Sequence, residues 1–107
     1  MSLDISLSAV REVEVYDANI THNLNDMAEA AGIYECIWRP EEINITKAHQ
    51  LINPLTHGLN RLKSRPEYYK QYDSTNGWGL YIHFVPFVEK YLKACIDNPD
   101  ANVKAWR

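Results

Sequence analysis

Three short stretches of the sequence hold the side chains best suited to bind a ligand: NITHN at residues 19–23, WRPEE at residues 38–42 and NGWG at residues 76–79. Each combines hydrogen-bonding groups with a ring or a titratable side chain. None of them matches a catalytic signature, so we predict binding residues and no catalytic residue.

In the segment DSTNGWG, residues 73–79, two glycines flank a tryptophan just before a long apolar periodic segment. Asn76-Gly77 favours positive φ angles, which predicts a sharp turn that throws Trp78 to one side. One interpretation buries Trp78 at the edge of the core, where it would fix the entrance of the next helix. The other makes Gly77, Trp78 and Gly79 the rim of a site where backbone amides of residues 76–80 hold an anion at a helix N-terminus.

In NITHN, the polar side chains Asn19, Thr21, His22 and Asn23 come where an expected strand passes into a helix. They offer donors, acceptors and an imidazole, whose ordinary pKa lies near neutrality, at the end of a strand, where ligands are often bound. The alternative is local capping, with Thr21 or Asn23 bonded to the helix start and His22 bonded to a nearby carbonyl.

In WRPEE, Arg39 is the only basic residue between Arg11 and Lys47. An arginine beside Trp38 could clamp a carboxylate or phosphate and stack on a ring. Because acids flank it, a structural ion pair is the competing interpretation.

Other kinds of site find less support. The histidines and cysteines show no Cys-x-x-Cys or His-x-x-x-His spacing, so we predict no metal site and no cofactor. Cys95 lies on an apolar stripe and Cys36 is next to Ile37, which favours buried, inert thiols over a disulfide or a nucleophile. Residues 61–72 mix bases with tyrosines, as single-stranded nucleic-acid sites do, but a pI of about 5.7 argues against nucleic acid as the partner.

The totals predict one ordinary domain spanning residues 1–107, with 46% hydrophobic and 23% charged residues. The N-terminal residues do not resemble a signal peptide, and no apolar run approaches the roughly 20 residues that span a bilayer, so we expect a cytoplasmic protein that does not bind membranes. Residues 1–44 carry nine acids and two bases, whereas residues 45–107 carry five acids and nine bases. This asymmetry could bias association with charged partners, unless the two halves interleave in space.

The elements that must position these side chains begin with two strands. Residues 3–9 and 10–20 alternate apolar and polar residues, which predicts an antiparallel hairpin with a turn near residues 8–11. The C-terminal ANVKAWR alternates again and predicts a third strand. Its partner in the sheet is not readable from the pattern.

Between these strands, helical signals recur. A short helix over residues 23–31 should end at Gly32, and the buried segment IYECIW should end before Pro40. An apolar stripe over residues 48–62 predicts an amphipathic helix, with Pro54 and Gly58 as points where it bends or splits. Pro66 begins a short segment, and the most regular stripe predicts a long helix over residues 81–95, bent early by Pro86.

This order predicts an α+β fold: a small, mostly antiparallel three-stranded sheet, made of two N-terminal strands and the C-terminal strand, with three to four helices on one face.

The combination of NITHNL, IYECIWRPEE, NGWGLY and NPDANVKAWR resembles a group of small conserved proteins of bacteria and phages that has no assigned activity. The resemblance extends over nearly the whole chain. It implies no catalytic residue and only marks the three segments as the positions of interest.

These observations favour a non-enzymatic cytosolic protein that binds a small polar or anionic ligand where NITHN, Trp38-Arg39 and NGWG meet at one end of the sheet. The alternative is a protein-interaction module, of the inhibitor or immunity type, that uses an acidic face against a basic partner. A hydrolase with His22 as base would need a nucleophile or water within about 3 Å of the imidazole, and the sequence offers no candidate. Oligomeric state is left open.

Overall fold

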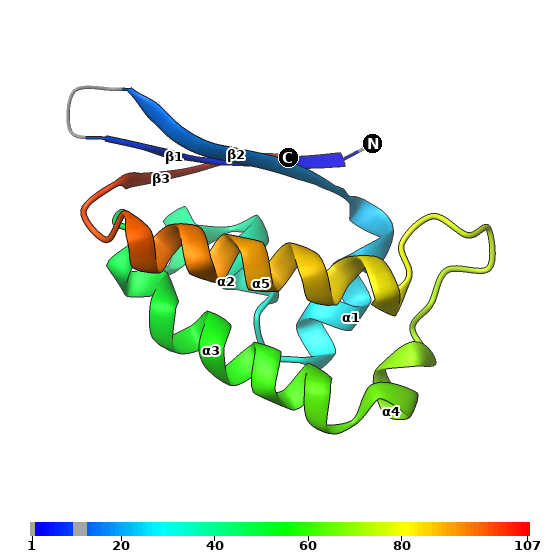
Figure 1. Cartoon of the computed structure of the whole chain (residues 1–107). Helices are drawn as coiled ribbons and strands as arrows, with labels where there is room; N and C mark the ends of the chain where they lie inside the picture. Colours follow the sequence, from blue (N-terminus) through cyan, green and yellow to red (C-terminus); the bar gives the residue numbers. More distant parts are fainter. Residues whose placement is uncertain (1, 10–12) are drawn as a thin grey trace.

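The computed structural model describes residues 2–9 and 13–107, and in it one antiparallel sheet lies above a layer of helices (Figure 1). The strands are β1 (Ser2–Ser8), β2 (Glu14–Thr21) and β3 (Asn102–Trp106), in the order β2-β1-β3. The α+β prediction is confirmed, and the C-terminal strand pairs with β1. Residues 10–12, where we expected the turn and the start of the second strand, lie outside the described residues.

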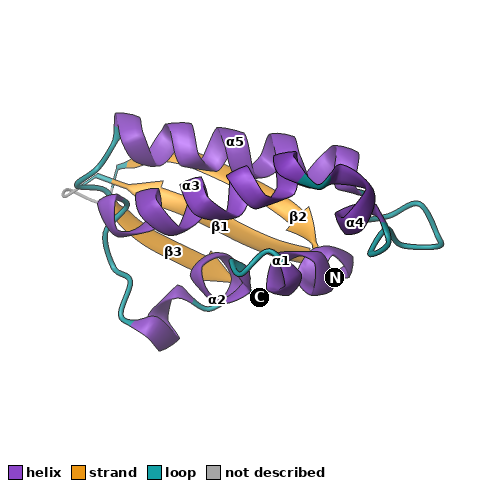
Figure 2. Ribbon diagram, turned by 90° about the horizontal axis from the view of Figure 1, so that it is seen from below, coloured by secondary structure: helices purple, strands orange, loops and turns teal. Residues whose placement is uncertain are grey.

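The two faces of the sheet differ because apolar and polar side chains alternate along its strands. On β1 the apolar residues Leu3, Ile5 and Leu7 are buried against the helices. Their partners on β2 in the same layer are Ile20, Ala18 and Tyr16. The opposite face, which carries Asp4, Asp17 and Trp106 among others, is not covered by any helix in the described chain (Figures 1 and 2).

Seven helical segments connect β2 to β3 within the described residues. They are η1 (His22–Leu24), α1 (Asn25–Ala30), α2 (Tyr34–Trp38), η2 (Pro40–Ile43), α3 (His49–Ser64), α4 (Pro66–Lys70) and α5 (Tyr81–Asp97). The expected helix over residues 23–31 is therefore a 3-10 turn followed by a short α-helix. Thr21 Oγ1 accepts a hydrogen bond from the amide of Asn23 at 3.3 Å, so the predicted cap is present.

The two long helices run side by side beneath the sheet (Figure 2), with α5 adjoining β2. Despite Pro54, α3 is one continuous helix, and α5 begins at Tyr81, well before Pro86. The helix does not split at Gly58 either. A Cβ built there would lie 2.3 Å from Cγ2 of Ile33, so glycine is needed for close packing.

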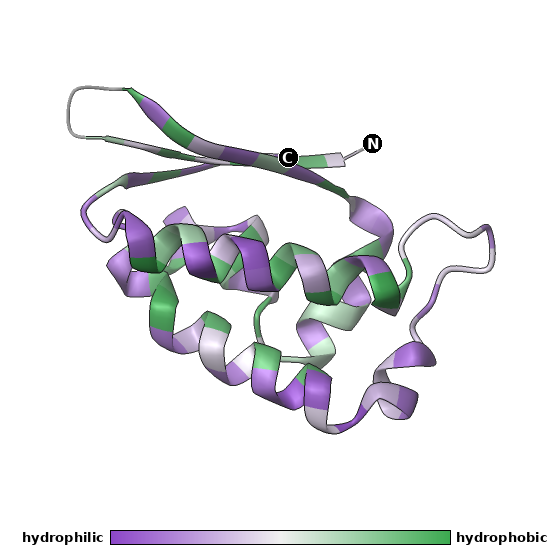
Figure 3. Cartoon of the chain, viewed as in Figure 1, coloured by the Kyte–Doolittle hydropathy of each residue, from purple (hydrophilic) through white to green (hydrophobic). Residues whose placement is uncertain are grey.

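The apolar residues of all these elements form one buried cluster, which includes the fully buried Trp38, Phe84 and Tyr91 (Figure 3 colours the ribbon by hydropathy). Each such side chain contributes about 1.5–3 kcal/mol through burial. No helix of the described chain is long and apolar enough to cross a membrane.

Candidate functional site

An open cavity of about 1030 Å³ lies between β2 and α5 and extends to the loop before α5. We call it the β2–α5 groove. Its lining residues come from β1, β2, η1, the loop and α5: Ser2, Tyr16, Ala18, Asn19, Ile20, Thr21, His22, Asn23, Leu24, Asn76, Gly77, Trp78, Gly79, His83, Pro86, Phe87 and Lys90.

The groove brings NITHN and NGWG together, as we expected for a shared pocket. Asn23 Nδ2 donates a hydrogen bond to the carbonyl oxygen of Trp78 at 2.9 Å. Gly79, at φ 99°, packs so closely that an added Cβ would lie 2.9 Å from Cβ of Asn23 and 3.1 Å from Cγ2 of Thr21. Glycine is required at this position both for its backbone angle and for this contact.

Trp78 is not buried at the core edge, which overturns that interpretation: its side chain is 71% exposed. Gly77, which precedes Trp78, has φ 81°, and a Cβ added there would meet no other atom within 4 Å. The sharp turn predicted from Asn76-Gly77 is therefore present, and it places the indole at the rim of the groove.

Several amides that the anion interpretation needs already donate hydrogen bonds within the loop, so the geometry disfavours that interpretation, which stays a prediction. The amide of Asn76 donates to Ser74 Oγ, that of Trp78 to Asn76 Oδ1, and that of Tyr81 to Asp73 Oδ1. The Asp73 carboxylate accepts from the first amide of α5, so an anion placed there would meet its negative charge.

His22 is tied to the core by a hydrogen bond. The indole Nε1 of Trp38 donates to His22 Nδ1 at 2.9 Å, and Trp38 is only 1% exposed. Because Nδ1 accepts this hydrogen bond, Nε2 is the ring nitrogen that carries a proton. Trp38 itself does not line the groove and reaches it only through His22.

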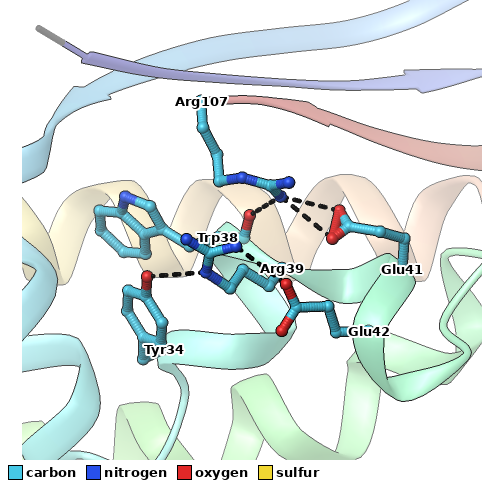
Figure 4. A network of polar contacts seen from close by, with 6 residues as sticks. All are labelled: Tyr34, Trp38, Arg39, Glu41, Glu42 and Arg107. Carbon is cyan, nitrogen blue, oxygen red and sulfur yellow. Dashed lines mark hydrogen bonds and ion pairs between the residues drawn. The ribbon is translucent and has the colours of Figure 1, made fainter.

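Arg39 is not at the groove, so the expected meeting of all three segments is only partly right. Its Nε donates to the hydroxyl of Tyr34 at 3.1 Å, and its Nη1 pairs with Glu42 at 2.8 Å (Figure 4). These two hydrogen bonds raise the pKa of Arg39. The structural interpretation of WRPEE is thus the one that the geometry supports.

The same network ties the C-terminus to α2. Nη1 of Arg107, just beyond β3, donates to the carbonyl oxygen of Trp38 at 2.9 Å and to both carboxylate oxygens of Glu41 (Figure 4). The ring of Tyr34 stacks on that of Trp38 with centroids 5.6 Å apart. WRPEE therefore positions Trp38, and through it His22.

Sequence reasoning missed the residues that α5 supplies: His83, Pro86, Phe87 and Lys90. They lie on a helix that we expected only to fill the core. None of the lining residues is an acid, although the chain has 14 Asp and Glu. Lys90 has no ion-pair partner among the described residues, whereas Lys93, three residues on, pairs with Asp97 at 3.1 Å.

Metal and thiol chemistry find no support in the described chain. It contains no group of three or more His, Cys, Asp or Glu arranged to hold a metal ion. Cys36 and Cys95 are buried and unpaired, and burial raises the pKa of each thiol to about 12. The prediction of buried thiols without a disulfide is confirmed.

Comparison with known proteins finds no family model, no curated protein and no solved structure that matches this chain. The resemblance to bacterial and phage proteins stays a prediction.

Proposed function

We propose that this chain is a cytosolic, non-enzymatic binding protein whose site is the β2–α5 groove. The observation that carries the proposal is the lining of the groove, which is partly apolar and holds no carboxylate. Its titratable groups are Lys90, His83, His22 and Tyr16. In a protein of net charge −3, such a cavity favours a ligand with an anionic or hydrogen-bond-accepting group. The two buried, reduced thiols fit a cytosolic location.

Catalysis finds no support in the geometry of His22. Nδ1 of its imidazole accepts a hydrogen bond from an indole, and no serine, cysteine or carboxylate is bonded to it among the described residues. A general base needs a reacting group within hydrogen-bond reach and a partner that orients it for proton transfer.

The test compares Lys90→Gln with Lys93→Gln. Both remove one positive charge from α5, but Lys93 lies outside the groove and pairs with Asp97. The probes are inorganic phosphate, citrate and acidic peptides, and their binding is read by the melting temperature and by intrinsic tryptophan fluorescence. We expect a stabilising probe whose effect falls in Lys90→Gln and persists in Lys93→Gln, because only ligands of the native state raise its melting temperature. Equal loss in both variants, or no probe with any effect, contradicts the proposal.

A second candidate function uses the uncovered face of the sheet. Asp4, Glu14 and Asp17 lie there beside Trp106, which is 53% exposed, around a shallow depression of about 410 Å³. Acids around an exposed ring suit a basic protein partner, as an inhibitor or immunity-type module would require. A partner that Lys90→Gln retains and Asp4→Asn/Asp17→Asn releases would favour this function over the groove.

A further inference from the structure

The two edges of the sheet are treated differently. The outer edge of β3 is paired at its start with the segment before α3: the amide of Val103 donates to the carbonyl oxygen of Thr46 at 2.9 Å, and Lys47 forms a bridge with Asn102. β2 has β1 as its one neighbour, and no described backbone is hydrogen-bonded to its outer edge. Every second residue of β2 therefore presents a free amide and carbonyl to the outside.

The β2–α5 groove runs beside that open edge. Tyr16, Ala18 and Ile20, at every second position of β2, form its wall on the sheet side. Pro86 and Phe87 of α5 face them from below. A strand laid along β2 would direct every second side chain into the groove, since neighbouring strands share their faces.

Resting on the binding function proposed above, we propose that the occupant is an extended segment of another polypeptide, which adds to the outer edge of β2 as a fourth strand. Main-chain hydrogen bonds to β2 would supply affinity, and alternate side chains in the groove would supply specificity. The rim favours such a partner over a small ion. Trp78, which lines the groove, is 71% exposed and offers more apolar surface than a small ion would cover.

The charges on the two faces specify the segment further. On the uncovered face, β2 presents Glu14 and Asp17, so the added strand should carry basic residues on that side. On the groove side it meets apolar walls and Lys90, which has no ion-pair partner in the described part of the chain, so it should carry apolar residues and one acid. A second copy of this chain fits poorly, because antiparallel pairing of two β2 strands would bring acids of both copies together.

The experiment selects nonapeptides from a displayed random library against the whole chain, then measures the binding of the selected peptides to wild type, Lys90→Gln and Lys93→Gln. We expect sequences that alternate basic with apolar residues. Those with an acid on the apolar side should lose roughly fivefold in affinity for Lys90→Gln only, as a partly exposed ion pair of about 1 kcal/mol predicts.

Two measurements test strand addition itself. Methylating every second backbone nitrogen of a selected peptide should abolish binding, and methylating the intervening nitrogens should change the affinity less than about threefold, because a fourth strand uses alternate amides. In the complex, hydrogen exchange should slow at alternate amides of β2 and be unchanged on β3.

The other outcomes separate the inference from the proposed function. Peptides that bind in a Lys90-dependent manner, without the alternating methylation pattern or protection of β2, overturn strand addition and leave the groove as a binding site. If phosphate or citrate binds but the library yields no binding peptide, strand addition is likewise overturned and the groove remains a binding site. A dimer whose β2 amides are protected would make the occupant a second copy. A peptide that shows the alternating methylation pattern and protects β2 without depending on Lys90 supports strand addition and contradicts the anion-binding part of the proposed function. If no selected peptide and no anion binds, both the inference and the proposed function fail.

Discussion

At the scale of single residues, His22 is both a groove residue and a structural one, because its Nδ1 accepts the hydrogen bond of the buried Trp38 indole. His22→Ala would leave that donor without a partner, and we expect it to lower the free energy of unfolding by about 1–3 kcal/mol. The matched variant His83→Ala removes an exposed imidazole of the same groove and should change stability by less than about 0.5 kcal/mol. Denaturant titration of both proteins measures this, and equal stability of the two contradicts the structural role of His22.

The hydroxyl group of Tyr91 destabilises the fold, in contrast to the stabilising hydrogen bond of His22. It is buried in the core with no hydrogen-bond partner among the described residues, and burial raises its pKa well above the usual value. Tyr91→Phe should therefore raise the free energy of unfolding by about 1 kcal/mol, since it removes an unsatisfied polar group. Tyr81→Phe should lower the free energy of unfolding by a similar amount, because the Tyr81 hydroxyl donates to the carbonyl oxygen of Leu62 at 2.7 Å. Thermal melting measures both variants. If both substitutions shifted the melting temperature in the same direction, the Tyr91 hydroxyl would not be the unsatisfied group that we infer.

At the scale of elements, the approach of α3 to the segment before α2 depends on Gly58. A Cβ there would lie 2.3 Å from Ile33, so Gly58→Ala must displace one element from the other. We expect a loss of about 1–3 kcal/mol from overpacking, although alanine gains about 1 kcal/mol in helix propensity. Asn60→Ala, at an exposed position of the same helix, should be neutral or slightly stabilising. Urea denaturation distinguishes the two, and a stable Gly58→Ala protein would show that α3 can shift at little cost.

At the scale of the whole molecule, the core should make stability fall in alkaline solution. Burial raises the pKa of Cys36 and Cys95 from 9.0 to about 12, so the folded chain keeps protons that the unfolded chain loses above pH 9. Their contribution to stability is therefore fully present below pH 9 and is lost as the pH rises toward 12. Melting temperatures measured across this range should fall less steeply in Cys36→Ala/Cys95→Ala than in wild type. Parallel slopes would contradict the prediction.

Much of the fold followed from local patterns. Alternation in the N-terminal and C-terminal segments predicted the three strands, and the apolar stripes predicted α3 and α5, because burial of one face imposes a period of two or 3.6 on the sequence. The left-handed conformation of Gly32 and the end of α2 before Pro40 were equally local. Local patterns did not predict the element boundaries or the continuity of α3 through Pro54. Packing against α5 and the sheet holds that helix together.

The candidate site divides in the same way. The residue types of NITHN and NGWG marked them as candidates, and the turn at Gly77 followed from Asn-Gly itself. That the two segments meet, that Trp78 is exposed, and that Arg39 lies elsewhere were decided by tertiary structure. Tertiary structure also decided that α5 contributes residues to the groove. In the sequence, an exposed Lys90 near a buried Phe87 indicates only an ordinary amphipathic helix. Local sequence determines which elements form and what chemistry their residues carry. Which of those residues face one another depends on the order β2-β1-β3, which is set by long-range packing that no local pattern encodes.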